Sequence, residues 1–114
     1  MADEQASFGH VSDGDEVVIV ASGELDAASS ERFAEAAYQY IGTGKRLVLD
    51  LGSATFMDSS GLKVLATMAV ARAGSGGVLV RNPCLQIRKL LQVAGMSHVV
   101  TVEPPLEQIV PIAS

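Results

Sequence analysis

Short apolar runs separated by turn residues predict several β-strands. The run over residues 17–21 follows Asp13-Gly14, a pair that favours a tight turn, so residues 8–11 are expected to pair with it as an antiparallel hairpin. The run over residues 47–51 is of the kind found in a strand covered on both faces. The strands predicted in this way are 8–11, 17–21, 47–51, 78–81 and 98–102.

Apolar residues that recur at helical spacing predict three helices between the later strands. In the second of them, one face collects Leu62, Leu65, Ala66, Ala69 and Val70. Serines or a proline mark the starts, and glycines mark the ends. The helices run from residues 27–30 to Gly42, from near Ser59 to a point before Gly74, and from Asn82-Pro83 to Gly95.

The order β-β-α-β-α-β-α-β predicts an α/β fold with a mixed β-sheet. After the opening antiparallel hairpin, the strands alternate with helices and are expected to lie parallel through right-handed crossovers. A brief polar link is expected between the strand at 47–51 and Phe56, and the tail over residues 106–112 is predicted to form a helical turn or two. A chain of 114 residues with 48% hydrophobic content has room for one core, so residues 1–114 are interpreted as a single domain.

The balance of charge argues against nucleic acid and membrane surfaces as partners. The chain has 13 acidic residues against 8 lysines and arginines, so its formal net charge of −5 supplies no attraction for phosphate backbones or anionic lipid. The acidic start is unlike a secretory signal and the apolar runs are shorter than the ~20 residues of a membrane span, which predicts a cytoplasmic chain. Cys84, the single cysteine, is expected to be partly buried, and no metal or other cofactor is predicted.

The most informative stretch is Asp58-Ser59-Ser60-Gly61-Leu62, where a loop after a strand turns into a helix. Asp58 suits the N-cap position, because its carboxylate can accept hydrogen bonds from the free N–H groups of the first turn. The hydroxyls of Ser59 and Ser60 would then lie near the surface. A phosphate there would carry about −1.5 to −2 charges beside the positive end of the helix dipole, so the fold could accept it while a docked partner would be repelled. This motif therefore predicts a binding switch.

Two motifs give the chain a resemblance to a known family. Gly23-Glu24-Leu25-Asp26 follows the second predicted strand, and Phe56-Met57-Asp58-Ser59-Ser60-Gly61-Leu62 opens the second helix. Together with Val93-Ala94-Gly95-Met96 before the last strand, they resemble the STAS domains, and within them the bacterial anti-sigma factor antagonists. The resemblance covers nearly the whole chain apart from the tail.

The resemblance implies a partner-switching regulator of transcription, of the kind used in stress responses, and no enzymatic activity. It implies that an anti-sigma factor serine kinase phosphorylates Ser59, that the unphosphorylated form binds this kinase and frees a sigma factor, and that a protein phosphatase resets the cycle. The place of Asp26 beside the serine is likewise implied by the resemblance and does not follow from spacing. The implied partner-binding residues are Gly23, Glu24, Asp26, Asp58, Ser59, Ser60, Gly61 and Leu62.

Other interpretations of these motifs stay open at this point. Asp58 and its neighbours could serve only as a helix cap, Gly23 to Asp26 could form a solvated turn, and Ser60 could be a second phosphate acceptor. The glycines at 42–44 and 74–77 are interpreted as a turn and a helix stop, since neither set matches a phosphate-binding motif.

Two other functions compete with the switch. One is a non-switching STAS scaffold subunit of a stressosome-like or lipid-transport assembly. The other is a serine hydrolase using Ser59, which is weakly supported because no G-x-S-x-G motif surrounds that serine. His10 and His98 lie in predicted strands and are interpreted as structural or exposed residues. The oligomeric state and the sigma factor concerned do not follow from the sequence.

Overall fold

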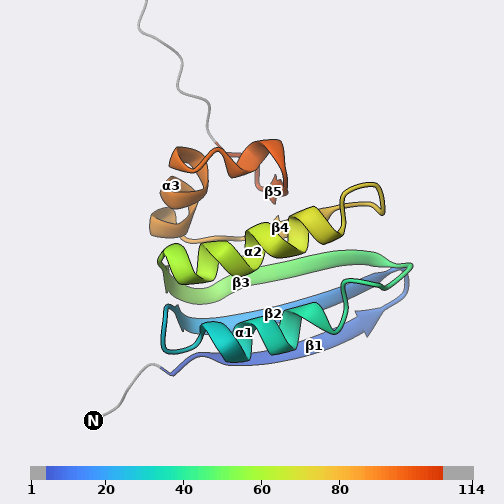
Figure 1. Ribbon diagram of the computed structural model, residues 1–114, viewed down its shortest axis with the longest axis horizontal. Coiled ribbons are helices and arrows are strands. Elements are labelled where there is room, and N and C mark those ends of the chain that lie inside the picture. The colour runs from blue at the N-terminus through green and yellow to red at the C-terminus, as the bar shows by residue number, and fades with distance from the viewer. Residues whose placement is uncertain (1–4, 107–114) are drawn as a thin grey trace, which may run out of the picture.

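The computed structural model describes residues 5–106, which form a five-stranded sheet with helices packed against it (Figure 1). The strands lie in the sheet in the same order as in the chain. The first two are antiparallel, and every later neighbour pair is parallel. This confirms the mixed α/β fold with an opening hairpin. The strands are β1 (Ser7–Asp13), β2 (Glu16–Leu25), β3 (Arg46–Met57), β4 (Val78–Arg81) and β5 (Thr101–Glu103).

The hairpin turns where the sequence predicted it. Asp13 and Glu16 are the last paired residues of β1 and β2. Between them Gly14 has a φ of +57°, in the left-handed region that favours glycine. The turn itself consists of Gly14 and Asp15, and a glycine at the first of two turn residues favours a tight hairpin.

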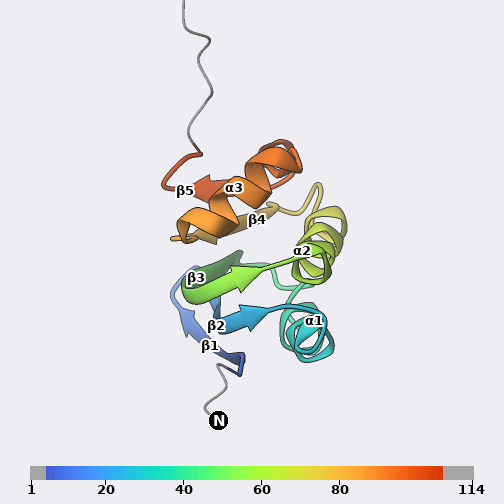
Figure 2. The same ribbon diagram turned by 90° about the vertical axis from the view of Figure 1, so that its left-hand side faces the viewer.

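Three helices follow the hairpin in the described part of the chain: α1 (Ser30–Tyr38), α2 (Ser59–Ala71) and α3 (Leu85–Val93). Each connects a parallel strand to the next one along the sheet. α1 and α2 contact each other and pack on one face of the sheet, whereas α3 contacts the 3₁₀ helix η1 (Met96–His98) and the end of β3. Figure 2 shows α1 and α2 side by side along that face. The core between sheet and helices includes Ile19, Leu25, Phe33, Leu49, Leu65, Met68, Ile87 and Leu91.

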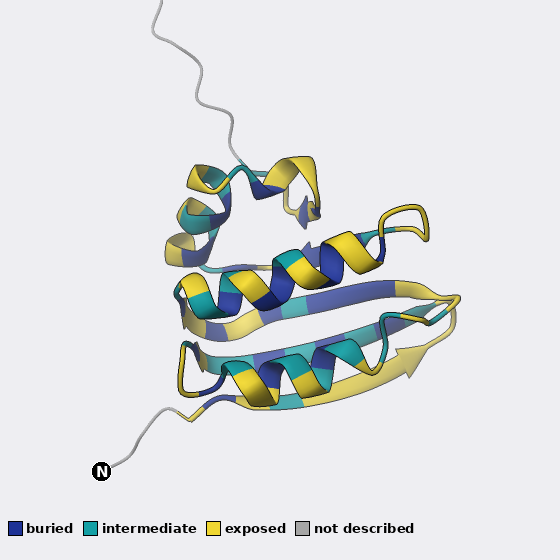
Figure 3. Cartoon of the chain, viewed as in Figure 1, coloured by how far each residue is buried: buried dark blue, intermediate teal, exposed yellow. Residues whose placement is uncertain are grey.

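β3 is buried over Leu47, Val48 and Leu49, whereas β1 is largely exposed (Figure 3). Leu47, Leu49 and Leu51 join the core under the helices. Val48 points to the other face, where it lies in register between Val18 and Leu79 and is 0% exposed. Both faces of β3 are thus buried at this point.

β3 extends further than the sequence indicated. The expected polar link is strand, because residues 53–57 continue to pair with β2 as far as Leu25 opposite Met57. Two register shifts, after Val20 and after Gly23, accommodate this extension. The link was predicted from its polar side chains, but strand pairing is a backbone interaction that tolerates exposed side chains on an outer face.

The last predicted strand begins too early. Residues Met96–His98 form a 3₁₀ helix, η1, after Gly95 at a φ of +69°, and β5 begins only at Thr101. The N–H groups of Val99 and Val100 both bond to the carbonyl of Met96, which keeps them out of the sheet. His98 is therefore not a strand residue.

The first helix is shorter than the sequence predicted. α1 ends at Tyr38 and not at Gly42, because the following residues form tighter turns, with Tyr40 N–H bonded to the Ala37 carbonyl. The predicted helical tail over 106–112 lies beyond Leu106, outside the described residues.

The C-terminal end of α2 is held by a buried arginine. Arg72 is 1% exposed, and its guanidinium donates to the carbonyls of Gly77 at 3.0 Å, Thr43 at 2.7 Å and Lys45 at 3.0 Å, with a further bond to Ile41 at 3.2 Å. These carbonyls belong to the loops before β3 and before β4. The glycine-containing segments at 42–45 and 74–77 are therefore a turn and a helix stop fastened to one side chain, as expected apart from the arginine.

Candidate functional site

Asp58 caps the N-terminus of α2, as the sequence predicted. Its backbone is extended, with φ −115° and ψ −166°, and its Oδ1 accepts a hydrogen bond from the Ser60 N–H at 2.8 Å. Its own carbonyl accepts from the Leu62 N–H at 3.0 Å, which closes the first helical turn. One residue thus ends β3, satisfies a free donor of the helix and starts α2.

Ser59 is the first helical residue and is exposed. Ser60 and Leu62 are half-buried, and Gly61 is buried. The turn Asp58–Leu62, called the serine turn below, therefore presents the Ser59 hydroxyl to solvent at the positive end of the helix. This location makes the hydroxyl accessible to a docking protein.

The structure brings the two sequence motifs together. The ends of β2 and β3 are paired, with Glu24 opposite Phe56 and Leu25 opposite Met57. The Leu25 carbonyl also accepts a hydrogen bond from the Asp58 N–H at 3.2 Å. Gly23 to Asp26 and the serine turn are consequently neighbours on one end of the sheet.

The side chain of Asp26 is engaged in its own turn. Its Oδ1 accepts from the N–H groups of Ala28 at 3.1 Å and Ser29 at 3.2 Å. Ser29, which is 3% exposed, donates its hydroxyl proton to the Glu24 carbonyl at 2.7 Å. Asp26 thereby shapes the turn that leads into α1, a role that sequence reasoning had left open as a solvated turn.

Gly61 is required by close packing against the end of β2. A Cβ at this position would lie 2.6 Å from the Leu25 carbonyl oxygen and 2.9 Å from Met57 Cγ. Gly23 has a similar reason, since its φ is +84° and a Cβ there would lie 2.8 Å from the Gln5 carbonyl oxygen. At both positions, the absence of a side chain allows two backbone segments to lie closer together than a larger residue would permit.

Gln86 is a site residue that the sequence analysis missed. From the second position of α3, its Oε1 accepts from the Met57 N–H at 2.9 Å and its Nε2 donates to the Met57 carbonyl at 2.8 Å. Nearby, the half-buried Cys84 places its Sγ 3.8 Å from the Thr55 carbonyl oxygen. No local motif signals these contacts, because they join segments 29 residues apart.

Apolar side chains flank the serine turn. Phe56, just before it in β3, is 37% exposed, and Leu85, next to Gln86, is 68% exposed. Leu62 within the turn is only half-buried. These exposed or half-buried apolar residues, in the turn or in the segments that adjoin it, are of a kind that suits protein contact.

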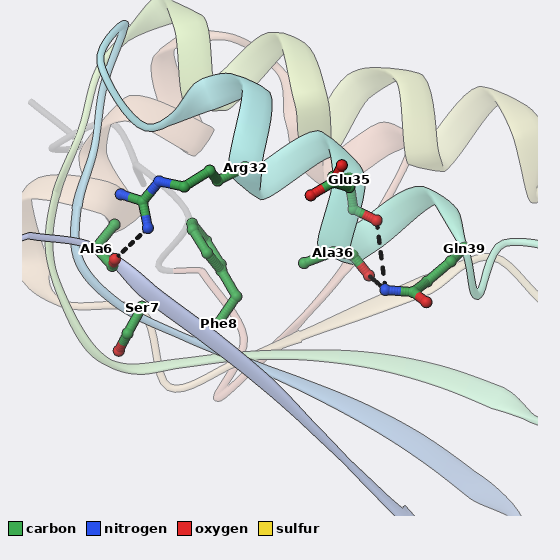
Figure 4. A pocket seen from close by; sticks show the side chains of 7 residues that line it. All are labelled: Ala6, Ser7, Phe8, Arg32, Glu35, Ala36 and Gln39. Carbon is green, nitrogen blue, oxygen red and sulfur yellow. Dashed lines mark hydrogen bonds between the residues drawn. The ribbon is translucent and has the colours of Figure 1, made fainter.

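Other features lie apart from this surface. A cavity of about 350 Å³ opens between β1 and α1, where Arg32 donates to the Ala6 carbonyl at 2.8 Å and its guanidinium lies 5.7 Å from the centre of the Phe8 ring (Figure 4). None of the predicted site residues lines it. Within residues 5–106, no group of three His, Cys, Asp or Glu side chains is arranged to hold a metal, and no helix is both long and apolar enough for a membrane crossing.

Comparison with known proteins identifies the family. The family model described as "Mlab, STAS domain" matches residues 8–103, so the chain belongs to the STAS domain family. A STAS-domain containing protein of Pseudomonas aeruginosa (strain UCBPP-PA14) is 29% identical over 87 residues, which are 75% of this chain and 86% of that protein.

Solved structures share the fold. An anti-sigma factor antagonist from Mycobacterium paratuberculosis matches with a TM-score of 0.83 at 23% identity, over 92% of this chain and 91% of that one. The Bacillus cell fate determinant SpoIIAA in its phosphorylated form matches with a TM-score of 0.65 at 24% identity, over 84% of this chain and 90% of that one. The STAS-like fold expected from the sequence motifs is therefore confirmed.

Proposed function

We propose that this chain is an anti-sigma factor antagonist that works by partner switching. Its unphosphorylated form binds an anti-sigma factor serine kinase and releases the sigma factor, and phosphorylation on Ser59 blocks that binding. The observation that carries the proposal is the exposed Ser59 hydroxyl at the first position of α2, beside the paired motif at the end of β2. The similar structures described as anti-sigma factor antagonists, one of them phosphorylated, support it.

The charge of the serine turn explains how a phosphate would act. A phosphate on Ser59 gains the helix dipole, and the cation nearest to it along α2 is the exposed Lys63, four residues on and on the same helix surface. It adds about two negative charges next to the Asp58 carboxylate. The consequence is a change in surface charge and not the formation of an internal ion pair that reshapes the loop.

The same charge would be costly in a complex. A partner that covers Ser59 also covers the half-buried Leu62 in the same helical turn, so the phosphate would lose water beside an apolar group. Burying a charge without a partner costs several kcal/mol, on the order of 3 or more, which is enough to weaken binding more than a hundredfold. The proposed surface comprises Gly23, Glu24, Asp26, Asp58, Ser59, Ser60, Gly61 and Leu62. A protein phosphatase that removes the phosphate would restore binding.

The direct test is phosphorylation by the anti-sigma factor kinase of the same organism with ATP, followed by site mapping. We expect phosphate on Ser59. Ser59→Ala should bind the kinase persistently, whereas Ser59→Asp should bind weakly, because it places a negative charge at the contact. Ser60→Ala is the matched control and should still be phosphorylated on Ser59. Equal binding by both Ser59 variants and the parent would remove the mechanism.

A second candidate function is a non-switching STAS scaffold subunit of a stressosome-like or lipid-transport assembly. It stays under consideration because the matching family model is named for Mlab and not for an antagonist. In that case Ser59→Ala and Ser59→Asp should co-purify equally well with the other subunits of the assembly. A pull-down that recovers transporter subunits and no ATP-binding kinase would favour this candidate.

A further inference from the structure

Within residues 5–106, no strand pairs with the outer edge of β3 next to the serine turn. β4 pairs with β3 only from Leu47 to Asp50, whereas β2 remains paired as far as Met57. Along a parallel strand, successive residues turn their N–H and C=O groups to opposite sides. Asp58 N–H bonds toward β2, so the backbone groups of Met57 point away from β2, to the side that β4 has left.

α3 fills this gap with side chains. Gln86 supplies both an acceptor for the Met57 N–H and a donor for the Met57 carbonyl. A primary amide carries the same C=O and N–H groups as a peptide unit, so it can complete the ladder in the way that a residue of a neighbouring strand would. Cys84 makes a longer contact with the Thr55 carbonyl, one ladder position earlier.

We propose that Gln86 is a positioning residue for the serine turn, holding Met57 from the open edge of β3 so that Asp58 and Ser59 keep a fixed place. This inference rests on the proposed function for its effect on phosphorylation, but its structural part stands alone. Met57 directly precedes Asp58 in the chain. Gln86 bonds to the backbone of Met57 from one side of β3, and the Asp58 N–H bonds to Leu25 on the other side. Loss of either hold lets the helix start shift.

The chemistry of the contact selects glutamine. Asparagine is one methylene shorter, and lysine has no acceptor for the Met57 N–H. The carboxylate introduced by Gln86→Glu accepts from the Met57 N–H but faces the Met57 carbonyl without a donor. When that carboxyl is protonated, the donor returns. The Gln86→Glu variant should therefore hold the turn at low pH, where the carboxyl is protonated, and lose the hold as the pH rises and the carboxyl ionises.

A matched control lies on the same helix. Arg88 also bonds from α3 to backbone carbonyls, those of Pro104 at 2.9 Å and Pro105 at 2.6 Å, away from β3. Arg88→Ala thus weakens the docking of α3 without touching Met57. The experiment compares the parent, Gln86→Ala, Gln86→Glu and Arg88→Ala by amide NMR, by hydrogen exchange and by the rate of Ser59 phosphorylation.

We expect Gln86→Ala to shift the amide signals of residues 57–60, to speed exchange of the Met57 N–H about tenfold, and to slow phosphorylation by a similar factor. Arg88→Ala should leave these signals and this rate near the parent values. Gln86→Glu should show parent-like signals at acid pH only. Should Gln86→Ala fail to fold, the pH series of Gln86→Glu decides the question.

The inference is overturned if Gln86→Ala and Arg88→Ala move the same signals by the same amounts, or if the difference between Gln86→Glu and the parent at residues 57–60 does not change with pH. A failure of the proposed function gives a different result. If the proposed function is wrong, the kinase does not modify the parent, but the NMR comparison of the variants still tests whether Gln86 positions the turn.

Discussion

The two ends of α2 treat charge and solvent in opposite ways. At the C-terminal end, Arg72 is 1% exposed and donates to backbone carbonyls of two loops. At the N-terminal end, Ser59 is exposed, and the neighbouring Asp58 carboxylate accepts from the Ser60 N–H. The polar side chain at the C-terminal end bonds inside the fold, whereas Ser59 at the N-terminal end is exposed to solvent.

Both ends nevertheless agree with the helix dipole. A carboxylate caps the positive end of α2, and a guanidinium lies at the C-cap position, where cations are favourable. A phosphate on Ser59 would add negative charge to the end that tolerates it. The difference between the ends therefore separates stability from signalling: changes at Arg72 should act on folding, and changes at Ser59 should act on binding.

The largest expected effect is on folding, from removal of the buried guanidinium. Arg72→Met should lower the free energy of unfolding by about 3 to 4 kcal/mol, because the carbonyls of three or more loop residues lose their donor inside the protein. Chemical denaturation measures this. Arg81→Met, which removes exposed or half-buried ion pairs with Glu16 and Glu103, is the control and should cost less than about 1 kcal/mol. Equal losses in the two variants would deny the anchor role of Arg72.

A mixed effect is expected at Gly61, which lies within the serine turn but packs against β2. Gly61→Ala should cost roughly 1 to 3 kcal/mol, because its Cβ would meet the Leu25 carbonyl oxygen at 2.6 Å. It should also weaken kinase binding in the protein that remains folded, since α2 must move outward. Gly9→Ala, where nothing lies within 4 Å of the new Cβ, should change neither property. Unchanged stability of Gly61→Ala would show that the contact yields easily.

A smaller loss of stability is expected at the helix cap. Asp58→Ala should cost about 1 kcal/mol, because the Ser60 N–H loses its acceptor, whereas Asp58→Asn keeps an acceptor oxygen and should lose only part of that amount. Thermal or chemical denaturation of the two variants gives the comparison. If the alanine and asparagine variants were equally stable, the side-chain bond of the cap would contribute nothing measurable.

Local chemistry made much of this molecule predictable from its sequence. The hairpin followed from Asp13-Gly14, and the cap followed from Asp58 before two serines, because both depend on residues a few positions apart. The alternation of strands and helices then limited the topology. The two motifs are joined by the bond from Asp58 N–H to the Leu25 carbonyl, a contact between distant segments that spacing alone did not predict.

The features that escaped prediction depend on contacts between distant segments. Arginine is usually found at the surface. Arg72 can be buried because carbonyls of two loops accept hydrogen bonds from its guanidinium, and those loops are distant in sequence. In the sequence, Gln86 is an ordinary helix residue. Its contact with Met57 depends on the early end of the pairing between β4 and β3, which no local pattern indicates. Likewise, the polar residues after Leu51 gave no sign of strand, because the pairing with β2 involves the backbone alone.

The central claim is that a phosphate on Ser59 changes what the surface binds and not how the protein folds. The most direct measurement prepares fully phosphorylated and unphosphorylated protein, then compares their kinase affinity by titration and their unfolding free energy by denaturation. The account predicts at least a hundredfold weaker binding for the phosphorylated form, with stabilities within about 0.5 kcal/mol of each other. Equal affinities, or a loss of binding that tracks a loss of stability, would contradict it.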